Sequence, residues 1–280
     1  MINSTGVNGL TAKLESGILA NGNGKLIYLV SGTPNSFGLA SFVISIGGKT
    51  CTLNLNVDDT SQNPKSGYGQ NISDIDGNIY KTVYIGNQHW MAENLNTSKY
   101  NDGTLIQNEI DRYAWFKNTP ENGKGYGTWC YYSSGDTIDY RFGKIYNGYA
   151  VLPYSMDKKN ICPVGWHLPS VKEWEILIEY LGGNAIAAWK LKEKGIENWN
   201  VGNSNSLATN SSLFSALPGG ELNNYHGFWM KGSMGNWWTS YEDITAMNIA
   251  RSVAMDCVTG NVYISLVDKT RGYYVRCLKD

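Results

Sequence analysis

The sequence has few cysteines and few charged residues, and each scarcity excludes a class of protein. Five cysteines in 280 residues are too few for a small disulfide-stapled scaffold, and none of their spacings matches the CxxC pair of a zinc or redox site. Charged residues make up only 17% of the chain, and the net charge is -1. The chain therefore lacks the basic excess with which proteins bind phosphate groups, and we expect no nucleic-acid partner.

Long apolar runs are absent as well. No stretch approaches the about 18 to 20 apolar residues of a membrane-spanning helix, and Met1 to Leu10 lacks the basic start and apolar core of a signal peptide. Removal of an export signal would leave the same sequence. The absence therefore does not indicate the cytoplasm, and a lipid anchor upstream stays open.

Aromatic residues and glycine are abundant, with 10 Trp, 19 Tyr and 32 Gly. The aromatic content excludes disorder, and the glycine content excludes a long helical assembly. Every tryptophan lies between Trp90 and Trp238, whereas residues 1–57 contain only three aromatic residues. This change in composition predicts a first domain at residues 1–57, a polar linker at residues 58–70 and a second domain at residues 71–280.

The first domain has the pattern of a small antiparallel β-sandwich. Segments of alternating apolar and polar residues are separated by turns rich in Gly, Asn and Ser, and they cover residues 10–19, 25–30, 39–46 and 50–57. The phrase SGTPNSFGLASFVISI resembles the signature of bacterial immunoglobulin-like repeats, which implies a spacer that holds another domain away from a surface. Because free cysteine is usually buried, we expect Cys51 to be a buried strand residue.

The second domain contains one clearly marked helix. Ser170 can cap it, Glu173 can complete a capping box, and apolar residues from Val171 to Leu181 share one face before Gly182 and Gly183 end it. Further elements are a hairpin of two strands at 79–85 and 89–95, a second helix at 185–194, and late strands at 249–257, 261–267 and 273–278. Two helices followed by an antiparallel, loop-rich half predict an α+β fold.

Motifs that carry chemistry are scarce. His89, His167 and His226 lie far apart without the spacing of metal ligands, so we expect each to be structural. Asp74 and Asp76 alternate as in a calcium loop, but the position of its final glutamate is Ile85, which favours a hairpin turn. Nucleophile-elbow, Walker and dinucleotide-binding motifs are missing. The sequence predicts no cofactor, no metal and no catalytic residues.

The cysteines offer a structural prediction. Cys162 precedes the capped helix, and Cys277 lies in the last predicted strand. If the first and last strands of the domain pair, a disulfide can join these two residues and stabilise the fold by about 4 to 5 kcal/mol, and it would persist only in an oxidising compartment. Two buried thiols are the alternative, and a second bridge between Cys130 and Cys257 stays open.

Several segments, taken in order, resemble one family. They are DIDGNIYKTVYIGNQHWMAENLNTSKYNDGT, FGKIYNGYAV, ICPVGWHLPSVKEW, FSALPGGELNNYHGFW, GNWWTS and the ending YVRCLKD. They look like the Fibrobacter succinogenes major paralogous domain (FISUMP), which is found mostly in exported and lipid-anchored surface proteins of gut and rumen bacteria. The likeness covers about residues 67–280.

The resemblance implies a decorated C-type lectin-like fold, related to sulfatase-modifying enzymes and to the variable proteins of diversity-generating retroelements. The sequence departs from the motifs of these relatives at two places, so two of their activities are not expected here. Gly235 to Thr239 replaces the Trp-Asn-Asp motif of calcium-dependent lectins, and Cys257 and Cys277 are too far apart for the cysteine pair of the formylglycine-generating relatives. We therefore expect neither calcium-mediated sugar binding nor that enzyme activity.

The resulting hypothesis is a non-catalytic adhesion protein, located at the cell surface or outside the cell, that recognises a glycan or a surface protein. Aromatic rings stack on sugars and anchor protein interfaces, so the predicted ligand-binding residues lie in the loop-rich half: Asn223, Asn224, Tyr225, Phe228, Trp229, Tyr241, Glu242 and Arg251. Trp237 and Trp238 are expected in the core. The alternatives are a subunit or tip component of a surface filament, assembled by strand exchange through the first domain, and an enzyme on a sulfatase-modifying-like fold.

Overall fold

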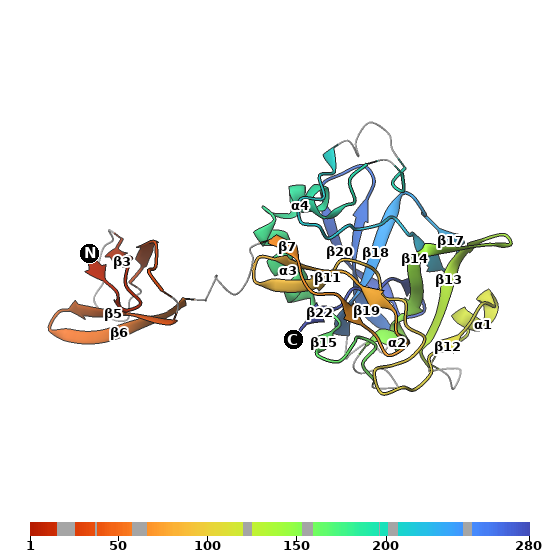
Figure 1. Ribbon diagram of the computed structural model, residues 1–280, viewed down its shortest axis with the longest axis horizontal. Helices are drawn as coiled ribbons and strands as arrows, with labels where there is room; N and C mark the ends of the chain where they lie inside the picture. Colours follow the sequence, from red (N-terminus) through yellow and green to blue (C-terminus); the bar gives the residue numbers. More distant parts are fainter. Residues whose placement is uncertain are drawn as a thin grey trace. The chain divides into compact units, whose positions relative to one another are not determined.

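The computed structural model describes residues 1–15, 26–36, 38–57, 66–119, 125–152, 159–195, 197–200, 207–242 and 248–280. The chain divides into two compact units, Met1–Pro64 and Lys65–Asp280 (Figure 1). Of the predicted linker, residues 58–65 lie outside the described residues, and Ser66–Tyr68 forms strand β7. None of the described helices has both the length and the apolar character needed to cross a membrane.

The first unit consists of two three-stranded antiparallel sheets. One contains β1 (Ile2–Asn3), β3 (Leu10–Leu14) and β4 (Tyr28–Gly32), and the other contains β2 (Thr5–Gly6), β5 (Gly38–Ile46) and β6 (Lys49–Val57). A small core lies between them, formed by Val7, Leu10, Ala12, Ala40 and Phe42. The prediction for Cys51 is wrong, because its thiol is exposed on β6.

The second unit is built from several small sheets. Their strand orders are β15-β22-β11-β10-β7, β12-β13-β14-β21-β16-β17, β18-β19-β20 and β8-β9. The strands after β7 are β8 (Ile72–Ser73), β9 (Ile79–Tyr80), β10 (Thr82–Ile85), β11 (Gln88–Met91), β12 (Gln107–Asn108), β13 (Thr128–Ser134), β14 (Thr137–Asn147), β15 (Trp166–His167), β16 (Glu221–Asn223), β17 (Gly227–Trp229), β18 (Met234–Glu242), β19 (Ile249–Asp256), β20 (Val262–Asp268), β21 (Gly272–Tyr273) and β22 (Leu278–Lys279).

The described helices are short. They are α1 (Arg112–Phe116), α2 (Gly148–Val151), α3 (Val171–Tyr180) and α4 (Asn184–Leu191). Ser170 and Glu173 form the predicted capping box of α3. The expected second helix ends early, because the backbone becomes extended at Lys192, whose buried ammonium group donates to the carbonyl oxygens of Asp256 and Thr259.

The fold class predicted from the sequence is wrong. Strands spread over many small sheets make up most of the regular structure, so the chain is mostly β, and the second unit is not the predicted α+β C-type lectin-like domain. Both predicted helices exist, but α3 and α4 have only ten and eight residues. Elsewhere turns that contain glycine join neighbouring strands into hairpins such as β10–β11. The two strands of a hairpin form backbone hydrogen bonds with each other, so these segments are strands and not helices.

Aromatic side chains fill the larger core of the second unit. Trp90, Trp174, Phe214 and Trp237 come from four separate segments, and their ring centroids lie 4.8 to 6.4 Å apart. Trp237 and its neighbour Trp238 are both fully buried, as expected from the sequence. Helix α3 supplies Trp174 to this cluster, which explains why its apolar stripe faces the sheets.

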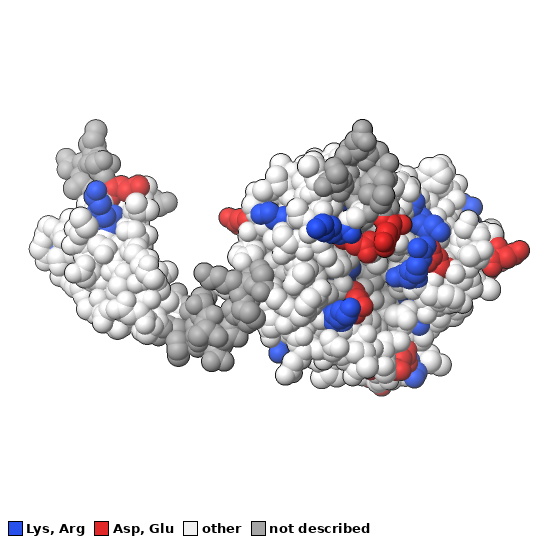
Figure 2. All heavy atoms as spheres, turned by 45° about the horizontal axis from the view of Figure 1, so that its top comes forward, with Lys and Arg blue, Asp and Glu red and all other residues white. Residues whose placement is uncertain are grey.

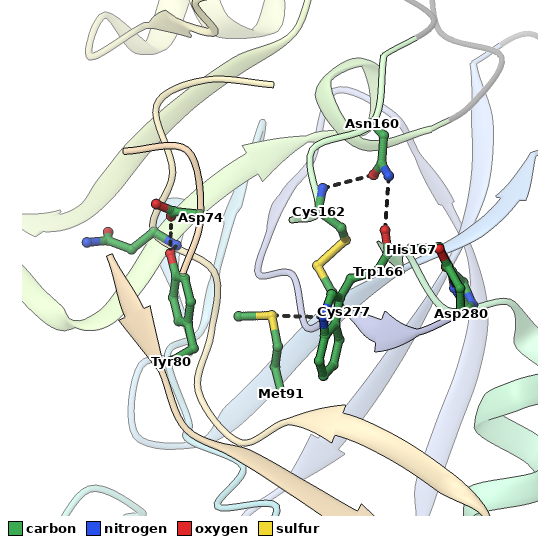
Figure 3. The surroundings of a disulfide bond; sticks show 10 residues. Asp74, Tyr80, Met91, Asn160, Cys162, Trp166, His167, Cys277 and Asp280 are labelled. Carbon is green, nitrogen blue, oxygen red and sulfur yellow. Dashed lines mark hydrogen bonds and ion pairs between the residues drawn. A yellow bond between two sulfur atoms is a disulfide. The ribbon is translucent and has the colours of Figure 1, made fainter. Parts of the chain in front are cut away.

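The end of the chain closes the second unit. Strand β22 lies between β15 and β11, with His167 and Trp90 both paired with Leu278. Next to this junction Cys162 and Cys277 form the predicted disulfide, with their Cα atoms 5.9 Å apart (Figure 3). Cys130 and Cys257 are free thiols, so the second bridge is not formed.

His167 links the carboxyl end of the chain to helix α3. Its Nδ1 lies 2.7 Å from Asp280 Oδ1, and its Nε2 lies 2.9 Å from Glu173 Oε1. Burial acts to lower the pKa of His167, but the hydrogen bonds to the two carboxylates outweigh it, so the pKa is raised above its ordinary value. The folded state therefore favours the protonated imidazole.

We expect the His167→Gln variant to be less stable than the wild type at mildly acidic pH and to approach it as the pH rises. The contribution of the imidazolium is fully present below its unfolded-state pKa of 6.5 and is lost as the pH rises through the raised folded-state pKa. Because the pair is partly exposed, the difference should be about 1 kcal/mol or less. Urea unfolding across this pH range measures it, and a difference that grows with pH would contradict the assignment.

Candidate functional site

A groove on the second unit lies between the β16–β17 turn and the ends of β19 and β20. Its volume is about 370 Å³, and its lining residues are Asn224, Tyr225, Ile249, Leu266, Val267, Asp268, Thr270 and Arg271. This volume is within the range of small-ligand sites, about 300 to 1,000 Å³. Two other hollows, of about 260 Å³ beside the disulfide and about 450 Å³ beside α3 and α4, have no aromatic side chain in their linings.

The turn between β16 and β17 is held by the side chain of Asn223. Its Oδ1 accepts hydrogen bonds from the backbone N–H groups of Tyr225 (3.0 Å) and His226 (2.8 Å), and its Nδ2 donates to Glu221 Oε1 at 2.6 Å. Only 3% of Asn223 is exposed. Asn223 therefore shapes the turn, and it is not among the residues that line the groove.

Helix α1 supports the same turn from outside. Arg112 Nη2 donates to the carbonyl oxygen of Asn224 at 2.8 Å. Gly227, which follows the turn, has a φ of 75° and lies against the Arg112 guanidinium, so a side chain at this position would be both strained and crowded. The backbone of Asn224 and Tyr225 is thus fixed, while Tyr225 keeps 77% of its surface exposed.

The opposite wall carries one carboxylate and one guanidinium group. Asp268 Oδ1 accepts from the backbone N–H (2.8 Å) and the hydroxyl (2.7 Å) of Thr270, and Oδ2 takes no part in these two bonds. Arg271 Nη1 lies 3.0 Å from Glu221 Oε2. Burial acts to lower the pKa of Arg271, but Tyr273 and Glu221 raise it, so the guanidinium stays charged. The groove therefore contains both a charged hydrogen-bond acceptor, Asp268, and a charged hydrogen-bond donor, Arg271.

The remaining predicted residues lie outside the groove lining. Phe228 packs against Tyr132, with ring centroids 5.0 Å apart, and belongs to the edge of the core. Trp229 is 46% exposed and stacks on His226 at 4.5 Å. Phe228 is therefore structural, whereas Trp229 offers an exposed ring on β17, the strand that follows the turn.

Tyr241 and Arg251 form a pair next to the groove wall. The Arg251 guanidinium lies 4.6 Å from the centre of the Tyr241 ring, and Arg251 is opposite Leu266, a groove residue, in the β19–β20 pairing. The backbone of Glu242 pairs with Ala250 at the end of β18. The structure thus brings Asn224 and Tyr225 into the groove and places the Tyr241–Arg251 pair beside it, with Tyr241 on β18 and Arg251 on β19.

Sequence reasoning missed the far wall of the groove. Asp268, Thr270 and Arg271 lie in the polar phrase DKTRG between two strands, which was a visible turn signal. Nothing in the sequence alone connects that turn with Tyr225. The two segments meet only because β16 pairs with β21 in the folded chain, where Leu222 lies opposite Gly272.

The described residues contain no group of three or more His, Cys, Asp or Glu side chains that could hold a metal ion. The Asp74 carboxylate is already used by the turn that follows it, where it accepts hydrogen bonds from the backbone N–H groups of Asp76 and Asn78, from the Asn78 amide and from the Tyr80 hydroxyl. These hydrogen bonds hold the turn between β8 and β9, which is the hairpin turn predicted here.

Comparison with models of known families shows which family the chain belongs to. Residues 83–279 match the model of the family described as the Fibrobacter succinogenes major domain. The chain belongs to this family. The Fibrobacter succinogenes major domain here begins in β10 and ends in β22, so it contains the disulfide and every lining residue of the groove. Searches of curated proteins and of solved structures gave no match.

Proposed function

We propose that this protein is a non-catalytic binding protein of the cell surface, and that its groove takes a glycan. The observation that carries the proposal is the meeting of an exposed aromatic ring, Tyr225, with the polar groups of Asn224, Asp268 and Arg271 in one groove. Sugars present apolar C–H faces and many hydroxyl groups. A rigid ring with a few fixed donors and acceptors fits both.

The roles of the lining residues follow from their chemistry. The Tyr225 ring, 77% exposed, offers a flat apolar surface for one face of a sugar ring. Asp268 Oδ2 can accept from a hydroxyl group, and the Asn224 amide can both donate and accept. Because one carboxylate and one guanidinium line the groove, an uncharged sugar is favoured over a strongly acidic one.

The disulfide supports an extracellular location. Such bonds persist in oxidising environments and are rare in reducing ones, and Cys162–Cys277 is enclosed in the second core cluster, with both residues fully buried. Attachment to the outer membrane through a lipid anchor is part of the proposal. The first unit then serves as a spacer between the membrane and the binding domain.

Replacing Tyr225 with alanine is expected to weaken glycan binding by about tenfold, the loss of roughly 1.4 kcal/mol of ring contact. Because Tyr225 is exposed and its backbone is held by Asn223, the melting temperature should not change. A glycan array identifies the sugar, and titration calorimetry with that sugar measures both variants.

The matched control is Tyr68→Ala, which removes another exposed tyrosine, on β7. Asn224→Ala should weaken binding several-fold, since the amide lines the groove while its carbonyl oxygen continues to bind Arg112. Equal affinities for the wild type and the Tyr225→Ala variant would exclude the groove as the binding site.

A further inference from the structure

Strand β6 in the first unit has one free edge. It pairs with β5 over nine consecutive positions without a bulge, and the described part of the chain supplies no strand for its other edge. The free edge therefore presents a regular row of backbone N–H and C=O groups that none of the described strands satisfies.

The apolar core of the first unit extends to this edge. On β5, Ala40 and Phe42 are fully buried, but the residues opposite them on β6, Leu55 and Leu53, are 41% and 38% exposed. Cys51, the next residue on the same side of the strand, is also exposed. These three residues form an apolar row that the other sheet of the unit leaves uncovered.

Edge strands in proteins are commonly protected by charged residues, proline or bulges. Strand β6 has only Lys49 at its start, and the residues that follow, TCTLNLNV, contain neither a charge nor a proline. In the view of Figure 2, the surface of the first unit is mostly uncharged, and its charged side chains gather at one end. An unprotected edge of this length is suited to the addition of another strand.

The strand is complementary to itself. In an antiparallel pair centred on Leu53, all nine residues of β6 find a partner in a second copy, and Cys51 faces Leu55 on the core side. Lys49 meets Val57, so no like charges oppose each other. We propose that two copies of this chain associate by antiparallel pairing of their β6 strands. The interface is isologous and closed, and it joins the two exposed apolar rows.

This association goes beyond the binding groove and does not depend on it, since β6 and the groove belong to different units. A dimer carries two grooves. Two grooves on one particle raise the avidity for a repetitive polymer without any new contact to the sugar.

Sedimentation equilibrium of the full chain tests the association. The wild type should show a monomer–dimer equilibrium, and Leu53→Lys should raise its dissociation constant by about tenfold or more, because two lysines would face each other at the centre. Val43→Lys is the matched control. Val43 is 52% exposed on the opposite side of the same sheet, so this variant should dimerise as the wild type does.

The register is tested by cross-linking. In Leu55→Cys, the new thiol lies opposite Cys51 of the second copy, so mild oxidation should give a covalent dimer that reductant separates. Adding Cys51→Ser to that variant removes the partner thiol and should abolish the cross-link. A wild type that stays monomeric at every concentration, equal behaviour of the two lysine variants, or cross-linking that persists without Cys51 would overturn the proposal.

Discussion

Replacing both Cys162 and Cys277 with alanine is expected to lower the free energy of unfolding of the second unit by about 4 to 5 kcal/mol. The two residues are 115 positions apart, and closing a loop of that length lowers the conformational entropy of the unfolded chain by this amount. Urea unfolding followed by tryptophan fluorescence measures the loss. All 10 tryptophans lie between Trp90 and Trp238, so this signal reports on the second unit alone.

Reduction of the wild type supplies the control for this experiment. Wild-type protein in excess reductant should unfold at the same urea concentration as the double variant, and the double variant should not respond to reductant. If oxidised and reduced wild-type protein unfold alike, the bridge contributes no stability, which would contradict the expected loss of about 4 to 5 kcal/mol.

The Trp237→Ala variant is expected to lose about 3 to 5 kcal/mol of stability, the usual cost of removing a large buried aromatic ring. Trp237 is fully buried between Trp174 and Phe214, and its indole Nε1 donates to Asn94 Oδ1 at 2.9 Å. The mutation therefore leaves a cavity in the aromatic cluster. Equilibrium unfolding in urea gives the difference.

Trp229→Ala is the matched control, because Trp229 is also a strand tryptophan but keeps 46% of its surface exposed. Its loss should change stability by about 0.5 kcal/mol or less. Similar losses in the two variants would mean that Trp237 does not occupy the core as described.

Local patterns in the sequence predicted individual elements well. The Ser170–Glu173 capping box, the stop at Gly182 and the β10–β11 hairpin each depend on residues within a few positions of one another, so a short segment contains all the information. The last predicted strand, 273–278, shows the limit. It is divided into β21 and β22, which join two different sheets, because distant segments pair with its two ends.

The fold class failed for a related reason. The two helices were predicted correctly. The fold class, however, depends on the proportion of helix to strand and on how the strands pair, and most of the regular structure is strand. The prediction for Cys51 failed as well. Its thiol lies on the core side of β6, in one row with Leu53, but the other sheet of the first unit does not cover it. The alternation of side chains along a strand shows which face of the sheet a residue occupies. The residue is buried only if another sheet or helix covers that face.

Residue patterns within short segments predicted the local elements of this protein, the family of residues 83–279 and a bridge between Cys162 and Cys277. The folded chain added that most of the regular structure is β, that Asn223 shapes a turn, and that Tyr225 shares a groove with Asp268 and Arg271. A groove is made by segments far apart in the chain. Their meeting depends on sheet pairing and core packing, which no local pattern encodes.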